Sequence, residues 1–433
     1  MLKFMEITGS NKNSLIKDLK ARAIETEQEI ILSVSNILSK VKKEGDKALF
    51  ELTKSFDKIE LKTLEVSPSE LDECFNSVEK DFIEALKEAK LNIEEYHKKQ
   101  KANGFLMTKD KGVYLGQRVL PLERVGVYVP GGTAAYPSSV LMNVIPAKVA
   151  GVDEIIMVTP PDKDGGINPY IGVAARIAGI DKIYKVGGAQ AVGALAYGTG
   201  TIEKVDKIVG PGNIFVATAK KLVFGEVDID MIAGPSEILV IADEKSDPSF
   251  VAADLMSQAE HDKLASSILI TTSKELYEKV EVELERQVKA LEREEIIRAS
   301  LKDFGSAMIC GTIEECINIS NAIAPEHLEI MVDEPMKYLG MVKNAGSVFL
   351  GRYCPEPIGD YFGGTNHVLP TSGTARFFSP LSVDSFIKKS SFIYYSKEAI
   401  LENGEKIITL ANKEGLTAHA NSVKVRLNKN GNL

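Results

Sequence analysis

Four of the five histidines in this sequence stand in segments whose side chains could bind a metal or move a proton. His261, His327, His367 and His419 lie among glycines, prolines, carboxylates and amides, whereas His97 lies in a plain amphipathic segment and is expected to be solvated. Imidazole binds divalent metals and exchanges protons near neutral pH. These four segments are therefore the first candidates for chemistry.

Gln258 and His261 are expected on one face of a helix. Ser246-Asp247-Pro248 is typical of a helix start, and the helix should continue to about Lys263. Residues three apart on a helix leave the same face, and Asp254, one turn earlier, could orient the other two. Taken alone, this pattern favours a polar helix end with a hydrogen-bonded histidine over a metal site.

Two further candidate ligands, one carboxylate and one imidazole, lie far along the sequence from Gln258 and His261. Asp360 lies in a glycine- and aromatic-rich stretch, and His419 lies near the C-terminus. If both converged with Gln258 and His261, the imidazole, carboxylate and amide groups would suit zinc or a similar metal with open positions for a substrate. Gly-Asp is also an ordinary turn and a terminal histidine is normally solvated, so the spacing does not decide between these interpretations.

Glu326 and His327 place a carboxylate beside an imidazole. Oxidation of an alcohol needs a base that takes the hydroxyl proton, and histidine suits this task near neutral pH. The alternative is a helix N-terminus, with Pro325 in the first turn and Glu326 complementing the helix dipole. The two interpretations have equal weight from these residues alone.

Three glycine-rich turns follow expected strands. They are Gly126–Gly132, Gly187–Gln190 and Gly210–Asn213. Each lets the backbone approach a ligand closely and directs helix N–H groups at an anion such as a pyrophosphate. None is a GxGxxG fingerprint, so nucleotide binding is only modestly favoured over plain strand–helix turns.

From about Arg124, short β-rich runs alternate with helical segments such as Pro169–Ala178 and Ala191–Tyr197. The expected strands are Gly126–Val129, Glu154–Thr159, Lys182–Val186, Lys207–Val209, Ile238–Ala242 and Ser267–Thr271. This alternation predicts parallel βαβ units and an α/β fold. Right-handed crossovers should place the loops that follow the strands along one edge, where ligands bind.

The flanking regions are expected to be helices and one long loop. Ser67–Glu70 has the composition of a capping box, and apolar residues at spacings of three and four over 71–96 predict one long helix. The stretch 351–376 is expected to be a functional loop. Residues 397–421 are expected to form a helix interrupted at Gly415.

Composition bounds the class of protein. The chain has 433 residues, which predicts at least two domains. Its net charge is −9 and it has no long basic stretch, so the sequence shows no surface that would attract the phosphates of a nucleic acid. We expect no signal peptide and no membrane-spanning segment. The four cysteines, Cys74, Cys310, Cys316 and Cys354, form no CxxC pair, which suits a cytoplasmic protein.

Taken together, these segments resemble the histidinol dehydrogenase family over nearly the whole chain. The motifs that carry the resemblance, in order, are VYVPGG at 127–132, GGAQAVGALAYGT at 187–199, VGPGN at 209–213, AGPSE at 233–237, SQAEH at 257–261, APEHLE at 324–329, GDYFGGTNHVLPT at 359–371 and EGLTAH at 414–419. Each motif is weak by itself, but their shared order leaves little room for coincidence.

The resemblance implies a role for each candidate residue. It implies one zinc ion per subunit bound by Gln258, His261, Asp360 and His419, which also contact the substrate. Glu326 and His327 match the family's catalytic acid–base pair. The resemblance further implies that the substrate contacts or is surrounded by His327, Ser236, His367 and Glu414, and that NAD contacts Tyr128, Gln190 and Asn213.

The resemblance also implies a domain-exchanged homodimer with two Rossmann-like parallel-sheet domains, a helical N-terminal region and a small C-terminal segment. The expected division is an N-terminal arm over 1–25, a first α/β domain over 26–125 and 236–380 with the metal and acid–base residues, and a second over 126–235 with the NAD contacts. The segment 381–433 is expected to reach into the partner, so that Glu414 and His419 complete the other subunit's site.

The activity implied is the four-electron oxidation of L-histidinol to L-histidine through L-histidinaldehyde with two NAD, the last steps of histidine biosynthesis. The alternatives are a metal-dependent hydrolase that acts on a small imidazole or amino substrate, and a non-catalytic binding protein that kept the fold and metal site. A hydrolase would need no NAD, and the intact pair Glu326-His327 argues against a binding protein.

Overall fold

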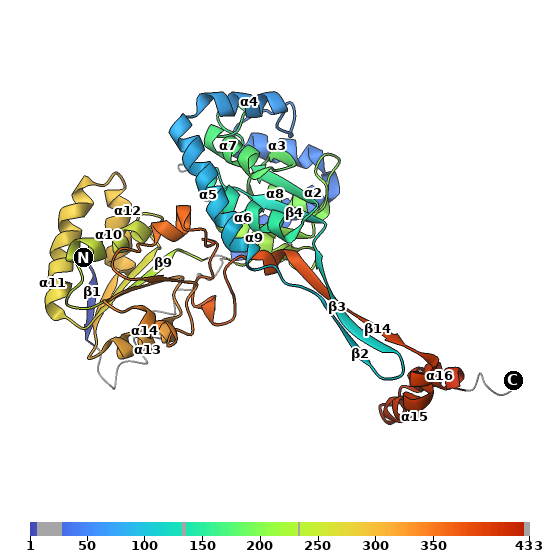
Figure 1. Cartoon of the computed structure of the whole chain (residues 1–433). Coiled ribbons are helices and arrows are strands. Elements are labelled where there is room, and N and C mark those ends of the chain that lie inside the picture. Colours follow the sequence, from blue (N-terminus) through green and yellow to red (C-terminus); the bar gives the residue numbers. More distant parts are fainter. Residues whose placement is uncertain (7–27, 132–135, 233, 428–433) are drawn as a thin grey trace. The chain divides into compact units, whose positions relative to one another are not determined.

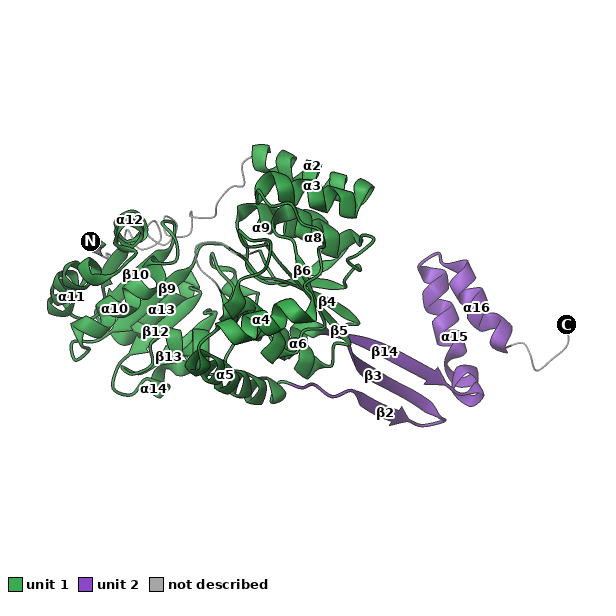
Figure 2. Cartoon of the chain, turned by 90° about the horizontal axis from the view of Figure 1, so that it is seen from above, with its two compact units in different colours: residues 1–100, 122–386 green, residues 101–121, 387–433 purple. Residues whose placement is uncertain are grey.

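The computed structural model describes residues 1–6, 28–131, 136–232 and 234–427. The chain divides into two compact units (Figure 2). The first unit comprises Met1–Gln100 and Leu122–Phe386, and the second comprises Lys101–Pro121 and Ile387–Leu433. The expected α/β fold is confirmed, since both sheets of the first unit are parallel and alternate with helices.

One sheet of the first unit has five parallel strands in the order β6-β5-β4-β7-β8. Its central strand, β4, is labelled in Figure 1. Its strands are β4 (Arg124–Tyr128), β5 (Glu154–Thr159), β6 (Lys182–Lys185), β7 (Lys207–Val209) and β8 (Asp228–Ile229), and its connecting helices are α6 (Pro137–Ala150), α7 (Pro169–Ala178), α8 (Gly188–Tyr197) and α9 (Ile214–Val223). The strands predicted between residues 126 and 209 are all present. We name this sheet, with its helices, the five-stranded half.

The N-terminal helices cover the five-stranded half. They are α2 (Gln28–Glu44), α3 (Asp46–Phe56), α4 (Pro68–Ser77) and α5 (Lys80–Lys98). Leu38 packs in one core with Tyr128, and Leu86 packs in another with Val127. The predicted division therefore needs correction, because residues 28–98 bury their apolar faces on the sheet that precedes residue 236 and not on the one that carries the acid–base pair.

The predicted capping box is present, but the predicted single helix is two helices. Ser67 Oγ accepts a hydrogen bond from the Glu70 amide at 3.2 Å, and the Glu70 carboxylate accepts one from the Ser67 amide at 2.7 Å. The chain is extended at Val78 and Glu79, which separate α4 from α5. This break lets α4 pack against α7 while α5 packs against α6.

The other sheet of the first unit has six parallel strands in the order β1-β11-β10-β9-β12-β13. Its strands are β1 (Lys3–Glu6), β9 (Glu237–Ala242), β10 (Ser266–Thr271), β11 (Ser306–Ile309), β12 (His327–Met331) and β13 (Ser347–Leu350), and its helices are α10 (Pro248–Ala259), α11 (Lys274–Gln287), α12 (Glu294–Phe304), α13 (Ile313–Ile323) and α14 (Met336–Leu339). We name it, with its helices, the six-stranded half. Apolar cores cover both of its faces.

The start of the predicted N-terminal arm is an edge strand of the six-stranded half. β1 pairs in parallel with β11, and the ammonium group of Met1 forms an ion pair with Glu281. Residues 7–25 of the predicted arm lie outside the described residues.

The second unit is a three-stranded antiparallel sheet followed by two helices. Its elements are β2 (Phe105–Lys109), β3 (Val113–Pro121), β14 (Ile387–Tyr395), α15 (Lys397–Lys413) and α16 (Thr417–Leu427). The predicted interruption at Gly415 is confirmed, with φ of 77° between the helices. The predicted start of the C-terminal segment needs correction, because Leu381 and Phe386 belong to an apolar core of the first unit and 101–121 belong to the second. Within the described residues, every helix is too short or too polar to cross a membrane.

Candidate active site

A cavity of about 620 Å³ in the first unit collects most of the predicted residues. Pro130 and Gly210, which follow β4 and β7, line it from the five-stranded half, and Ser236 and Glu326, which precede β9 and β12, line it from the six-stranded half. The cavity therefore lies at the carboxyl edge of one sheet and at the amino edge of the other. The expectation that ligand-binding loops follow the strands holds for the five-stranded half only.

The acid–base pair lies at the start of β12, so the helix-start interpretation of Glu326 is wrong. The register of β12 against β9, which pairs His327 with Ile238, brings both side chains to the backbone of Glu237. The Glu237 amide donates to Glu326 Oε2 at 2.8 Å, and His327 Nδ1 lies 3.0 Å from the Glu237 carbonyl oxygen. Because a carbonyl can only accept, Nδ1 carries a proton, and the Nε2 atom is buried without a hydrogen-bond partner.

Burial and nearby charges shift the titration of this pair. Burial raises the pKa of Glu326 to about 8, although His327 opposes the shift. Burial alone would lower the pKa of His327, but Glu326, Asp360 and Glu356 raise it to about 10. The titration of His327 is therefore set by three neighbouring carboxyl groups, those of Glu326, Asp360 and Glu356.

The carboxylates of Asp360 and Glu356 lie close to the imidazole of His327. His327 Nε2 lies 3.7 Å from Asp360 Oδ1 and 3.8 Å from Glu356 Oε1. One donor atom from each of the three side chains lies within 4.8 Å of the others, which is a metal-sized separation. Burial raises the pKa of Asp360, but the nearby groups, the imidazole of His327 first among them, together outweigh burial and lower this pKa to about 2.

Asp360 is presented by an irregular turn in the predicted functional loop. The turn Ile358–Phe362 is π-helical, a form that is frequent at functional sites. Glu356 stands just before it, and its amide donates to Glu329 Oε1 at 2.8 Å. The sequence prediction missed Glu356; the signal available was a carboxylate between two prolines, four residues before Asp360.

Gln258 and His261 approach the cavity from the end of α10. Asp247 caps this helix as predicted, but the helix ends at Ala259 and not near Lys263, so His261 stands just beyond it with its amide 3.1 Å from the Gln258 carbonyl oxygen. Burial lowers the pKa of His261, and Asp360 opposes the shift through its charge. Both side chains line the cavity.

The donor set fits a divalent metal ion. Gln258 Oε1 is buried without a hydrogen-bond partner, although a buried amide oxygen normally has one. It lines the cavity together with the imidazole of His261 and the carboxylate of Asp360. One amide oxygen, one imidazole nitrogen and one carboxylate oxygen are ligands that zinc accepts, with room for further ligands.

Two supporting residues differ from their sequence-based interpretation. The Asp254 carboxyl group is paired with Glu329, and burial raises its pKa to about 6. Its nearest ionisable partner is thus Glu329, whereas the sequence suggested that it could orient Gln258 and His261. His97, expected to be solvated, is fully buried in α5, where Nδ1 lies 2.8 Å from the Ile93 carbonyl oxygen and Nε2 lies 3.4 Å from Asn366 Nδ2.

His367 lies in the cavity wall beside Asp360. Its Nδ1 is 3.1 Å from the Asp360 carbonyl oxygen, and its Nε2 is 3.2 Å from Ser139 Oγ. Burial lowers its pKa, so it stays neutral near pH 7. A neutral imidazole held at both nitrogens suits the predicted place beside a substrate.

The residues predicted to contact NAD belong to the five-stranded half. Asn213 lines the cavity and caps α9, with its side-chain oxygen 3.0 Å from the Phe215 amide. Tyr128 is buried; its hydroxyl oxygen accepts from the Gly188 amide at 3.0 Å, and burial raises its pKa to about 12. Gln190 is buried with its Oε1 atom unpartnered. Contact of these residues with NAD stays a prediction.

Glu414 and His419 belong to the second unit. Glu414 ends α15, His419 lies in the first turn of α16, and both are exposed. Their predicted roles, a substrate contact and a metal ligand, stay predictions.

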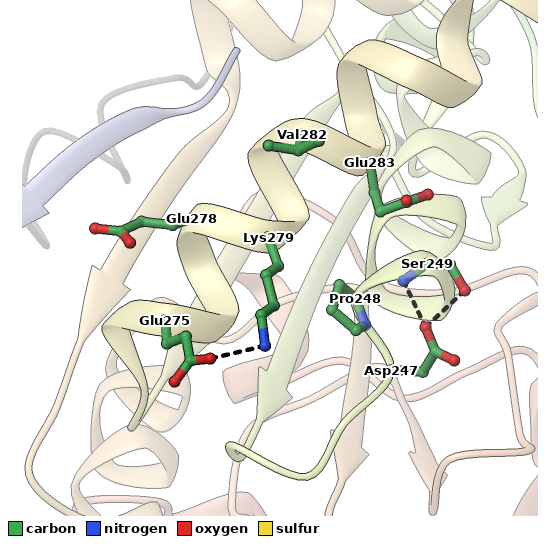
Figure 3. Close-up of a pocket in the computed structure, with 8 residues that line it drawn as sticks. All are labelled: Asp247, Pro248, Ser249, Glu275, Glu278, Lys279, Val282 and Glu283. Atoms are coloured by element: carbon green, nitrogen blue, oxygen red, sulfur yellow. Dashed lines mark hydrogen bonds and ion pairs between the residues drawn. The ribbon is translucent and has the colours of Figure 1, made fainter.

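A second hollow, of about 450 Å³, lies between the start of α10 and α11 (Figure 3). Lys279 is the one cation drawn there, and it is paired with Glu275 at 2.8 Å, while Asp247 bonds Ser249 at the helix cap. The predicted site residues do not line this hollow. Its charged side chains are paired among themselves or with neighbours on the same helix, as Glu283 is with Arg286.

The fold and the cavity define an α/β enzyme with a buried imidazole–carboxylate pair beside a potential metal site. The sequence profile of histidinol dehydrogenase matches residues 20–427. The histidinol dehydrogenase of Clostridium acetobutylicum is 62% identical over 410 residues, 95% of each chain, and that of Listeria monocytogenes is 54% identical over 98% of this chain and 99% of that protein.

A solved structure agrees with the sequence comparisons. The crystal structure of histidinol dehydrogenase from Elizabethkingia anophelis is 42% identical, with a TM-score of 0.92 over 99% of this chain and 98% of that one. The chain belongs to the histidinol dehydrogenase family, and its class is therefore that of the oxidoreductases.

Proposed function

We propose that this protein oxidises L-histidinol to L-histidine through L-histidinaldehyde, as the last steps of histidine biosynthesis in the cytoplasm. The observation that carries the proposal is the buried pair Glu326-His327 facing Asp360 in a cavity that Gln258 and His261 also line. Membership of the family supports the same reaction.

The reaction removes two hydrides and adds one water, so two NAD molecules act in turn as hydride acceptors. Zinc is the metal we propose; once bound, it would hold the substrate's imidazole and amino nitrogens and so fix the reacting carbon. Gln258, His261 and Asp360 of one subunit would hold it, together with His419 of the partner subunit. Ser236, His367 and the partner's Glu414 would surround the substrate in a homodimer.

His327 is the base for the alcohol proton. Its Nδ1 proton is held by the Glu237 carbonyl, so the unpartnered Nε2 is the atom that can accept a proton in the cavity. The carboxyl groups of Glu326, Asp360 and Glu356 raise its pKa to about 10. A divalent cation at Asp360 would cancel part of that negative field, and the pKa of His327 would then fall toward the neutral range that a base requires.

Glu326 activates water for the aldehyde step. Its pKa of about 8 reflects burial, so the carboxylate is a stronger base than an exposed glutamate. Its Oε2 atom accepts from the Glu237 amide, which fixes the side chain beside His327. The two neighbouring residues thereby serve two successive proton transfers.

The proposal is tested by counting NADH against histidinol consumed, with and without a chelator. We expect two NADH per histidinol, and loss of turnover on chelation with recovery on adding zinc. Consumption of substrate without NADH would indicate the metal-dependent hydrolase instead. Binding of histidinol without any turnover would indicate a non-catalytic binding protein.

A further inference from the structure

A buried ion pair in the wall of the cavity has no role in the chemistry described above. Lys220 of α9 and Asp230, just after β8, form an ion pair whose side chains are 4% and 1% exposed. Both residues line the cavity from the five-stranded half. Burying two charges costs desolvation energy that their attraction often fails to recover, so such a pair calls for a local reason.

Both members of the pair hold the backbone of Gly210. Lys220 Nζ donates to the Gly210 carbonyl oxygen at 2.9 Å, and Asp230 Oδ2 accepts from the Gly210 amide at 2.8 Å. Asp230 also accepts from the amide of Met231 at 2.6 Å. The two charged side chains therefore hold both the N–H and the C=O group of Gly210 by hydrogen bonds.

Gly210 is the first residue of the turn that leads from β7 to Asn213. Its φ is +111°, and a Cβ atom there would lie 2.0 Å from the Tyr128 carbonyl oxygen. The turn thus has a backbone shape that glycine alone accepts, pressed against the residue that ends β4. Without hydrogen bonds at both of its polar groups, such a turn has other conformations available.

We infer that Lys220 and Asp230 are positioning residues that hold the Gly210–Asn213 turn in the shape that accepts the NAD dinucleotide. This inference rests on the proposed function, because it assumes that NAD occupies this side of the cavity. Lys220 acts through the backbone and not as a phosphate ligand, since Asp230 already neutralises its charge.

The test measures NADH binding directly, by the fluorescence of the nicotinamide. The chain has no tryptophan, so tryptophan fluorescence does not interfere with this signal. Lys220→Met and Asp230→Asn should each raise the Kd for NADH by about tenfold or more, which corresponds to about 1.4 kcal/mol. The KM for histidinol and the metal content should change little. A phosphate ligand would behave differently, because Asp230→Asn would free the ammonium group and tighten NADH binding.

The matched control is Lys207→Met. Lys207 pairs with Asp228 at 2.9 Å and donates to the Ser385 carbonyl oxygen at 2.8 Å, at the opposite end of β7 from the cavity. This variant should lose stability without a change in the Kd for NADH. If its Kd rose as much as that of Lys220→Met, the effect would be general loosening of the sheet, and the positioning role would be overturned.

A double variant separates positioning from an unpaired buried charge. Lys220→Met combined with Asp230→Asn removes both charges, so its melting temperature should exceed that of the less stable single variant. Its NADH binding should stay weak, because the Gly210 carbonyl still lacks its donor. Wild-type affinity in the double variant would overturn the inference, whereas failure of the wild-type protein itself to bind NADH would overturn the proposed function.

Discussion

At the scale of single residues, the site depends on the backbone N–H and C=O groups of one residue, Glu237. The amide of Glu237 holds Glu326, and its carbonyl holds the Nδ1 proton of His327. One strand register thereby sets the orientation of the carboxylate and the tautomer of the imidazole. Two adjacent side chains can then have different partners and different tasks.

Replacing Glu326 by glutamine should separate the two half-reactions. The amide cannot take a proton from water, so oxidation of histidinaldehyde should slow by about 100-fold or more, while oxidation of histidinol should slow much less. Single-turnover NADH formation from each substrate measures the two steps. Equal losses in both would contradict the assignment of Glu326 to water activation.

Replacing His261 by asparagine should remove metal and activity together. The imidazole lies beyond the end of α10 and lines the same cavity as Gln258. Its loss would remove one of the few proposed metal ligands. Metal content per subunit, measured by elemental analysis, should fall in step with turnover. Glu326→Gln serves as the control that keeps its metal, and full activity in a metal-free His261→Asn protein would refute the ligand assignment.

At the scale of elements, helix α5 connects the outside of the five-stranded half to the functional loop. His97 of α5 is buried against Asn366, the neighbour of His367 in the cavity wall. Asn366 Nδ2 also donates to the Met142 carbonyl oxygen at 2.6 Å. A helix that the sequence placed only as an amphipathic surface element thus supports the segment that follows Asp360.

The burial of His97 should make stability depend on pH. Burial lowers the pKa of His97 in the folded protein below its unfolded value of about 6.5, so the unfolded chain binds a proton more readily and stability falls as the pH drops through that value. His97→Gln cannot gain that charge. Its melting temperature should therefore fall less than that of the wild-type protein between about pH 7.5 and about pH 5.5, and equal falls would disprove the role of His97.

At the scale of the whole molecule, the residues predicted for the site are divided between the two compact units. Eight of the predicted residues line the cavity of the first unit, seven of them Ser236, Gln258, His261, Glu326, His327, Asp360 and His367. Asn213 joins them from the five-stranded half. Glu414 and His419 lie in the second unit, and the homodimer we propose would bring them to the site of the partner.

Sharing of sites between subunits can be tested with mixed dimers. A Glu326 variant and a His419 variant are each expected to be inactive, but a dimer of one with the other would hold one doubly altered site and one intact site. Verified mixed dimers should therefore recover up to about half of the wild-type activity. An absence of recovery would indicate that each site is built within one chain.

The sequence by itself determined the elements and the chemical groups. Strand and helix periodicity, the cap at Ser67 and the glycine turns are local properties, and the structure confirms most of them. Two predictions from local patterns were wrong, the single helix that is broken at Val78 and the solvated position of His97. Both features depend on packing against surfaces from elsewhere in the chain.

Tertiary structure decided which edge of each sheet forms the site. A local pattern such as Pro325-Glu326-His327 fits a helix start or a strand start, and only pairing with β9 makes it the amino end of a buried strand. The burial that raises the pKa of Glu326 and the carboxylates that raise the pKa of His327 come from residues distant in sequence. Electrostatic and hydrogen-bond energies depend on distances through space, and spacing along the chain does not define those distances.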